Sequence, residues 1–572
     1  MSIYNEIGRI QSAKEDIVRA LDRIGIHIPS TDKIDEFAEK IDLVTKGKEI
    51  SYLPKDQNYL TFKFVEDGKF YWKTSSPSLT KVIQYQKNGS GTWTSVTAST
   101  NGYVCDVAEG DEIWVKGSET AYGDYSNYCY FGNTAFAYIS GDILSLINWG
   151  SLSQYCFRHL FMGNVKINIE SEHPLILSAT TLADYCYQYM FQGCTSLTTA
   201  PLELPATTLA NYCYSYMFSG CTSLTTAPLE LPATTLANSC YQYMFQGCTS
   251  LTTVPELPAT TLANNCYQYM FSGCTSLTTV PSNMLPATTL ASYCYQYMFY
   301  NCISLTTAPE LPATTLANSC YGYMFANCTL LQTAPELLAT TLTSGCYSNM
   351  FYNCTNLTTA PELLATTLAN NCYENMFRVC TSLTTAPQLP ATTLASYCYA
   401  NMFQGCTSLT TAPVLSATTL AQCCYQYMFQ GCTSLTTAPQ LPATTLAGSC
   451  YQYMFSGCTS LTTVPSNMLP ATTLETYCYA NMFQRCTSLT TAPELPATAL
   501  TSSCYSSMFN GCTSLNYIKA MFTTTPSTSY MSSWVSGVAS SGTFVKNSAA
   551  TWTNSCGTST YPCNWTVQRA SS

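Results

Sequence analysis

The chain has 572 residues, a formal net charge of −10 and only 9% charged residues. Nucleic-acid binding needs a basic surface that displaces counterions, so this composition excludes that class of function. No apolar run reaches the roughly 18 residues that a membrane span needs. The N-terminus lacks the basic stretch and apolar core of a secretory signal, so export by that route is not expected.

Hydrophobic spacing predicts a helical segment over residues 1–48. Apolar residues alternate at spacings of four and three, as in the seam of a coiled coil. We therefore expect an oligomerisation or docking segment, with a trimer favoured. The alternative is an intramolecular hairpin, in which this helix packs on a second helix that begins after Pro29. The residues of the expected seam are Ile3, Ile7, Ile10, Ile17, Leu21 and Ile24.

Residues 49–125 change to a period of two, with turn signals such as Asn101-Gly102 between the runs. Short alternating runs at this spacing predict a small antiparallel β-sandwich. The three tryptophans of this region are expected in its core rather than in a sugar-binding platform. They are Trp72, Trp93 and Trp114.

Residues 126–181 are expected to form degenerate capping repeats. The run from Cys156 to Asn164 matches the pattern of the repeats that follow, with Asn164 in place of a cysteine. Terminal repeats are usually atypical because they close the core against water.

Thirteen units of 26–28 residues fill residues 182–515, each with two cysteines spaced like Cys266 and Cys274. A period of this length is typical of a solenoid, in which each coil buries its apolar side against its neighbours. The predicted fold class is a leucine-rich-repeat-like solenoid with parallel strands and short helical turns, preceded by the helical segment and the β-sandwich. Residues 516–572 are expected to form a C-terminal β cap, in which Cys556 and Cys563 can close a small loop.

Within one unit, Leu262, Cys266 and Met270 lie four residues apart and would share one face of a helical turn. Positions that do not vary between the thirteen units are expected to face inward. The run 275–280 fits a short strand, and stacked strands about 4.8 Å apart would pair in parallel from coil to coil. The expected core residues of this unit are Cys266, Met270, Phe271, Cys274 and Leu277.

The cysteines of the repeats are interpreted as reduced thiols stacked in two ladders, because cysteine packs as a small buried hydrophobe. Disulfides between ladder neighbours are the alternative, if the coils bring Cα atoms within the roughly 4.4–6.8 Å that such bonds need. No pair has zinc-finger spacing, so no metal site is expected.

One variable column of the repeats is mostly tyrosine and is a candidate ligand surface. Tyrosine supplies contact area at low entropic cost, as in binding loops. Relaxed constraint on a solvated face explains the same variation, so both interpretations stay open. Paired threonines on the strand side likewise fit either a glycan-binding hydroxyl array or plain strand propensity. The tyrosines are Tyr189, Tyr216, Tyr243, Tyr269, Tyr297, Tyr323, Tyr427 and Tyr453.

The residues needed for catalysis are missing from the sequence. Its three histidines, His27, His159 and His173, have no acidic or cysteine partner in a recognisable motif. No nucleophile elbow, phosphate-binding loop, zinc-protease or dinucleotide-binding signature is present. We therefore expect no enzymatic activity and no cofactor.

The repeat frame MFxGCTSLTTAPxLPATTLAxxCY resembles the BspA-like leucine-rich repeats abundant in gut Bacteroidales and their phages. The resemblance covers about Cys156 to Leu515 and rests on the Phe-x-x-Cys-x-x-Leu core. Where the family usually has an Ala-Phe pair, this chain has Met270-Phe271. The resemblance implies a leucine-rich-repeat solenoid used for surface attachment. The N-terminal stretch is similar to the start of phage tail and fibre-associated proteins.

These resemblances imply a virion fibre that recognises the host. The N-terminal segment would contact other virion proteins or trimerise, and the solenoid would bind a glycan or protein of the bacterial surface. Such a protein would assemble in the host cytoplasm, where thiols stay reduced. Two alternatives are a bacterial surface adhesin and a purely structural spacer without a ligand.

Overall fold

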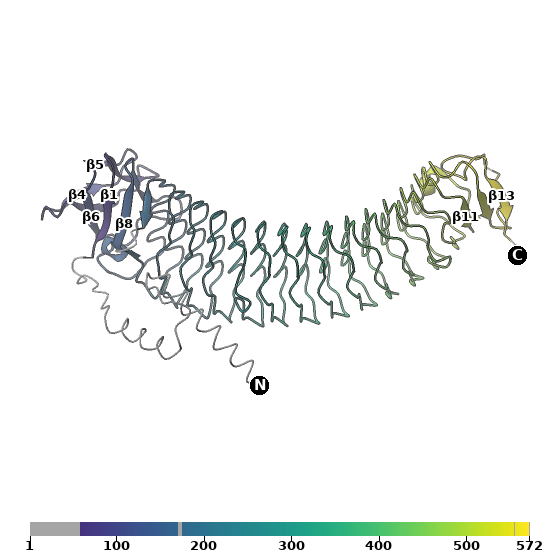
Figure 1. Ribbon diagram of the computed structural model, residues 1–572, viewed down its shortest axis with the longest axis horizontal. Coiled ribbons are helices and arrows are strands. Elements are labelled where there is room, and N and C mark those ends of the chain that lie inside the picture. Colours follow the sequence, from purple (N-terminus) through teal and green to yellow (C-terminus); the bar gives the residue numbers. More distant parts are fainter. Residues whose placement is uncertain (1–57, 170–173, 554, 571–572) are drawn as a thin grey trace, which may run out of the picture. The chain divides into compact units, whose positions relative to one another are not determined.

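A computed structural model describes residues 58–169, 174–553 and 555–570. Tyr59–Ser572 forms one compact unit, in which a β-sandwich is followed by a stack of coils (Figure 1). The predicted helical segment at 1–48, with its oligomerisation seam, lies outside the described residues.

Two sheets form the sandwich. The smaller has the order β5-β2-β7, and the larger has the order β10-β8-β1-β6-β3-β4, with β9 also paired to β8. Strands β1–β8 pair antiparallel, whereas β9 and β10 join β8 in parallel. The strands are β1 Leu60–Phe64, β2 Gly68–Thr74, β3 Val82–Lys87, β4 Thr94–Thr97, β5 Tyr103–Val107, β6 Glu112–Gly117, β7 Cys129–Asn133, β8 Ala137–Asp142, β9 Ile167–Ile169 and β10 Leu175–Ile176.

Aromatic residues of the two sheets meet in the sandwich core. The ring centre of Phe62 in β1 lies 4.8 Å from that of Phe70 in β2 and 5.0 Å from that of Phe131 in β7. Trp72 packs on the same Phe131 and is fully buried. Because β7 and β8 belong to these sheets, the sandwich continues past the expected boundary at residue 125.

Trp93 and Trp114 lie outside this core, so their predicted burial is wrong. Both are only half-buried and lie beside Tyr59. Trp114 alternates along β6 with the buried Ile113 and Val115 and therefore points to the opposite side of the sheet. A period of two predicts the strand but leaves open which of its two faces is covered.

The first coil continues directly from the sandwich. The Phe131 N–H donates to the Leu160 carbonyl at 2.8 Å, and the Ala137 N–H donates to the Lys166 carbonyl at 2.9 Å. The ring of Phe161 packs 5.8 Å from that of Phe131, between centres. A 3₁₀ helix, Ile143–Leu146, follows β8. The sandwich itself thus covers the N-terminal end of the coil stack.

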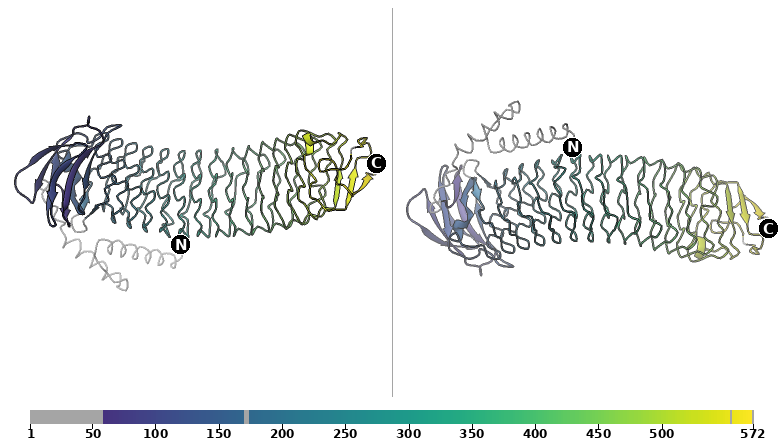
Figure 2. Two further views of the ribbon diagram at one scale, coloured as in Figure 1. Left: turned by 90° about the horizontal axis from the view of Figure 1, so that it is seen from above. Right: turned by 90° about the horizontal axis from the view of Figure 1, so that it is seen from below.

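On the strand side, single bridged residues join the coils where longer strands were expected. Figure 2 shows the coils stacked side by side between β10 and β11, a stretch that is described throughout. Parallel bridges link threonines of successive coils there, as from Thr307 to Thr333 to Thr359. Threonine hydroxyls also donate hydrogen bonds to the preceding coil, as Thr306 Oγ1 does to the Thr278 carbonyl at 3.1 Å. The pairing is parallel, as predicted, but the strand is reduced to isolated positions.

The turn side of the thirteen repeat coils is not helical, contrary to expectation. Asn265, Tyr269 and Gly273 have φ angles of 56°, 58° and 76°, in the left-handed region. The Gln268 N–H donates back to the Asn265 carbonyl at 3.2 Å, whereas the Tyr269 N–H donates to the Gln296 carbonyl of the next coil at 3.0 Å. Turn bonds of this kind recur every two residues and a left-handed residue recurs every four, so the spacing of the side chains imitates that of a helical turn.

Identical residues stack inside the coils and form continuous columns. The ring centre of Phe271 lies 5.6 Å from those of both Phe245 and Phe299. Tyr267 stacks in a second column, yet its buried hydroxyl has no hydrogen-bond partner in the described part of the chain. Five residues of this unit are fully buried: Cys266, Met270, Phe271, Cys274 and Leu277.

The two cysteine columns are reduced. Thirty of the 32 cysteines are free, so the alternative of disulfides between ladder neighbours is wrong. The second cysteine of a unit donates its thiol to a phenylalanine carbonyl of the preceding coil, as Cys274 does to Phe245 at 3.2 Å. Asn164 stands in this column, and its amide donates to the Phe131 carbonyl at 3.4 Å. Asparagine therefore supplies the bond that a cysteine supplies in the later coils.

Three parallel strands end the stack. They are β11 Tyr517–Ala520, β12 Thr543–Lys546 and β13 Thr566–Arg569, with a short helix, α3 Thr528–Met531, after β11. β11 is also bridged in parallel to the preceding coil, so the C-terminal segment adds coils to the stack. Trp534 is fully buried beyond Phe509 and donates its indole N–H to the Thr560 carbonyl at 2.8 Å.

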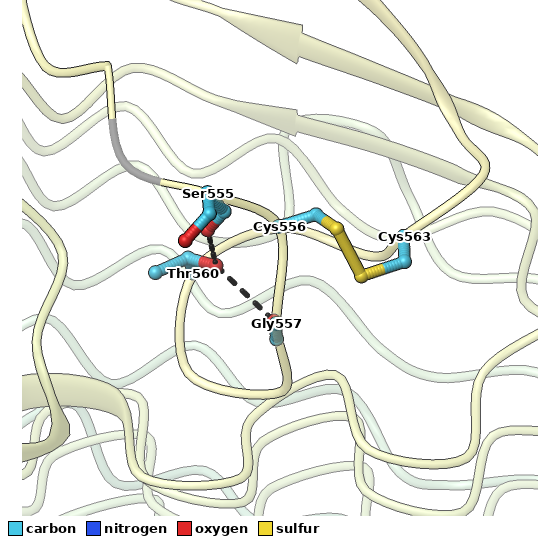
Figure 3. Close-up of a disulfide and its surroundings, with 5 residues drawn as sticks. All are labelled: Ser555, Cys556, Gly557, Thr560 and Cys563. Atoms are coloured by element: carbon cyan, nitrogen blue, oxygen red, sulfur yellow. Dashed lines mark hydrogen bonds between the residues drawn. A yellow bond between two sulfur atoms is a disulfide. The ribbon is translucent and has the colours of Figure 1, made fainter.

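A disulfide joins Cys556 and Cys563 in the last loop, as the sequence suggested (Figure 3). Inside this loop, the Thr560 hydroxyl lies 2.9 Å from the Ser555 carbonyl and 3.3 Å from the Gly557 carbonyl. The loop that carries Thr560 also accepts the Trp534 bond, so the disulfide stiffens the segment that closes the core.

Candidate binding surface on the turn side

The tyrosines of the predicted ligand surface lie in one column on the turn side. The ring centres of Tyr243 and Tyr269 are 4.5 Å apart, and those of Tyr269 and Tyr297 are 4.3 Å apart, with planes within 9° of parallel. The column begins in the sandwich and passes through a histidine. We call this continuous stack the tyrosine ladder: Tyr128, His159, Tyr189, Tyr216, Tyr243, Tyr269, Tyr297 and Tyr323.

Stacking decides which part of each ring a ligand can reach. Ring faces cover one another along the ladder, so edges and hydroxyl groups remain for contact. Burial raises the pKa of Tyr269 above its usual value, and the hydroxyl is therefore uncharged at neutral pH. Burial and the nearby Arg158 lower the pKa of His159 to about 3, so this ring is neutral as well. The ladder presents neutral hydrogen-bonding groups.

A second column of polar side chains lies one residue before the ladder. The Gln242 amide donates to Gln268 at 2.5 Å, and the Gln268 amide donates to Gln296 at 2.6 Å. Amide groups that bond to one another in a row are held in fixed orientations. Asn264 and Ser272, four residues before and after Gln268, do not share one face with it, because Ser272 is buried and Asn264 is exposed.

The ladder is interrupted in the second half of the solenoid. Asparagines with φ between 55° and 58° replace the tyrosines of three successive coils. Tyr427 and Tyr453 then form a separate stacked pair, 4.7 Å between ring centres. All eight predicted tyrosines thus lie in one column, but only six belong to the tyrosine ladder. The interrupting residues are Asn349, Asn375 and Asn401.

The prediction missed a row of glycines four residues after the ladder tyrosines. A Cβ atom on Gly247 would lie 3.9 Å from the Gly220 Cα, and one on Gly273 would lie 3.6 Å from the Gly247 Cα, so these backbones are in contact. A shallow trough of about 360 Å³ runs over them. The signal in the sequence was the glycine of the MFxGC frame. We call these residues the glycine row: Gly163, Gly193, Gly220, Gly247 and Gly273.

Within the described ranges, no group of three or more His, Cys, Asp or Glu side chains is arranged to hold a metal ion. None of the described helices is long and apolar enough to cross a membrane.

Comparison with known families gives one match. Residues 126–243, 182–332, 229–375, 292–436 and 422–533 match the model of the BspA type leucine-rich repeat region. These stretches overlap and together span most of the coil stack. A search of curated proteins found no match for the chain.

Proposed function

Since the chain belongs to the BspA-type leucine-rich-repeat family, we propose that it is a non-enzymatic attachment protein that binds a bacterial surface. The turn side of the coils would make the contact, and the partner would be a glycan or a protein of that surface. We further propose that the protein is part of a phage virion fibre, which docks to other virion proteins and self-associates through its N-terminal segment.

The observation that carries this proposal is the tyrosine ladder. It runs from the sandwich across seven coils without a break. The coil segments from Cys213 to Cys221 and from Cys266 to Cys274 contain no charged residue. Ordered tyrosines with fixed side chains lose little entropy when they contact a partner.

Binding to whole bacteria tests the attachment function. The double variant Tyr243→Asn/Tyr269→Asn breaks the ladder in its middle and suits the left-handed backbone, because asparagine already occupies this column in other coils. We expect cell binding to fall about tenfold, equivalent to about 1.4 kcal/mol. The control is Tyr293→Asn, at an exposed tyrosine of φ 59° outside the ladder. Equal binding by the parent chain, the double variant and the control would refute the ladder as the contact surface.

Two other functions remain as alternatives, and separate measurements distinguish them. A bacterial surface adhesin would label on the host cell envelope, whereas a virion protein would label on purified particles with specific antibodies. Absence of the protein from particles would contradict the virion proposal. A structural spacer would bind neither cells nor isolated envelope components.

A further inference from the structure

Backbone conformation favours glycine in the glycine row but does not require it. The five glycines have φ angles between 69° and 76°, a region that side chains rarely adopt. However, the same column holds Asn301, Val379 and Arg485 at φ angles of 60° to 63°. Tyr269 adopts 58° four residues earlier in its coil. Relief of backbone strain therefore does not by itself account for the glycines. Their missing side chains also leave a strip of surface open.

Two mostly buried serines line the trough, and their hydroxyls have no partner within the described residues. Ser219 is 7% exposed and Ser272 is 6% exposed, and both border the trough. Their backbone groups are bonded, but neither hydroxyl forms a hydrogen bond with any residue in the described part of the chain. Buried polar groups are nearly always satisfied by protein, water or a ligand. Because both residues line the trough, their hydroxyls are free to bond to a polar ligand there.

The glycine row leads from the trough to a second hollow, at the junction of sandwich and coils. This hollow has a volume of about 440 Å³ and is lined by Gly163, Tyr71 and Asn133, among others. A Cβ atom on Gly193 would lie 3.8 Å from the Gly163 Cα, and one on Gly220 would lie 3.8 Å from the Gly193 Cα. A path free of side chains thus joins the two hollows across five coils.

We infer that the glycine row and its two hollows bind a single chain of a neutral, unbranched polysaccharide, which lies across the coils. The inference rests on the proposed attachment function and names its ligand class. Lys73 is the one charged residue that lines either hollow in the described structure, so an anionic chain has no matching partner in the trough. The other polar side chains of the lining carry hydroxyls and amides, which donate to and accept from sugar hydroxyls.

The repeat of the coils also fits a polysaccharide. Successive coils lie about 4.8 Å apart, which is close to the length of one sugar unit in an extended β-linked chain. Each sugar would therefore meet the same kind of site as the one before it. The bare glycine Cα–H groups of the floor suit the apolar C–H faces of the sugars, and the serine hydroxyls suit their polar edges.

An extended peptide fits less well. Peptides that add to a β-structure need unpaired backbone N–H groups on the receiving edge. In the glycine row these donors are used: Gly220 donates to Gln246 at 2.7 Å, and Gly247 donates to Ser272 at 2.8 Å. A peptide chain would therefore find no backbone ladder to join.

The test uses the full chain and immobilised polysaccharides: β-linked glucan, xylan and mannan as neutral chains, polygalacturonate as an acidic chain, and gelatin as an extended polypeptide. The double variant Gly220→Asn/Gly247→Asn fills the trough with a residue that the column already accepts at Asn301. Gly511→Asn is the control, since this glycine has φ 78° and lies next to Arg485, away from the glycine row. Ser219→Ala/Ser272→Ala removes only the two hydroxyls.

We expect the chain to bind at least one neutral polysaccharide. The asparagine pair should weaken this binding about tenfold or more, the alanine pair should weaken it several-fold, and Gly511→Asn should leave it unchanged. Thermal unfolding of the alanine pair should match that of the parent, because the hydroxyls bond to no described residue. Binding to gelatin or polygalacturonate alone, no neutral binding, or undiminished binding by the asparagine pair would each overturn the inference.

Cell binding, measured in parallel, separates this inference from the proposed function. If Gly220→Asn/Gly247→Asn binds bacteria as strongly as the parent chain does, the polysaccharide path is contradicted and the proposed attachment function is not. A parent chain that binds a polysaccharide but no bacteria would contradict attachment and leave the path intact.

Discussion

The thiol of Cys274 donates to the backbone carbonyl of Phe245 in the preceding coil, 3.2 Å away. The same carbonyl accepts the Cys248 N–H at 3.1 Å, so it remains bonded if the thiol is removed. Cys274→Ala should therefore leave a small cavity and remove one bond between coils. We expect the free energy of unfolding to fall by about 2 kcal/mol. Urea unfolding followed by circular dichroism would show a lower midpoint.

The control for this prediction is Cys266→Ala. Cys266 is equally buried, but its thiol makes no hydrogen bond to a neighbouring coil within the described structure. We expect a loss of about 1 kcal/mol, from the cavity alone. Equal losses for the two variants would mean that the thiol bond contributes nothing to stability.

The stack should unfold in alkali. Burial raises the pKa of the Cys266 thiol to about 12, against 9.0 for an exposed thiol, and raises the pKa of Tyr267 as well. Because the pKa of the thiol is higher in the folded state, the stability that its neutral form contributes is fully present below pH 9. This contribution is lost as the pH rises toward 12. A pH titration should show tyrosinate absorption from the buried column only where the circular dichroism signal is lost. Ionisation of that column before unfolding would contradict the prediction.

Tyr267→Phe should leave stability unchanged or raise it by about 1 kcal/mol, because the hydroxyl is buried without a partner. Tyr122→Phe is the matched control. The Tyr122 hydroxyl donates to the Leu146 carbonyl at 2.5 Å in the sandwich, and its loss should cost about 1–2 kcal/mol. The unfolding temperature of Tyr267→Phe should rise or stay unchanged, whereas that of Tyr122→Phe should fall. A clear destabilisation by Tyr267→Phe would show that its hydroxyl is satisfied by water.

Removing the C-terminal disulfide should destabilise only the end of the stack. In Cys556→Ser/Cys563→Ser we expect a loss of about 2 kcal/mol, because the loop gains freedom when unfolded. Coils in solenoids depend mainly on their neighbours. Amide hydrogen exchange should therefore rise around Thr560 and stay unchanged around Phe271. A uniform rise along the chain would indicate a single cooperative unit.

The solenoid and its buried columns follow from the repeat, because a side chain that never varies between coils must meet copies of itself. The backbone of the turn side could not be predicted in the same way. A spacing of four between Cys266 and Met270 fits both a helical turn and linked β-turns. What separates them is the left-handed backbone at Tyr269, and tyrosine gives little sign of that conformation.

The candidate site was predicted in part for a similar reason. The tyrosine column was visible because its residues are large and vary between coils. The glycine row was not, because a glycine of positive φ has a sufficient explanation in its backbone alone. The unbonded hydroxyls of Ser219 and Ser272 beside it make it a candidate site, and hydrogen bonding cannot be read from a sequence. Likewise, the period of two around Trp114 predicted the strand but not which of its two faces is covered.

Every junction between coils uses equivalent atoms, such as the Tyr269 N–H and the Gln296 carbonyl. Excision of one whole unit would therefore rejoin partners of the same kind, and a duplication would insert them. Neither change would require a new interior. Each such event would lengthen or shorten the protein's reach by one increment of about 4.8 Å.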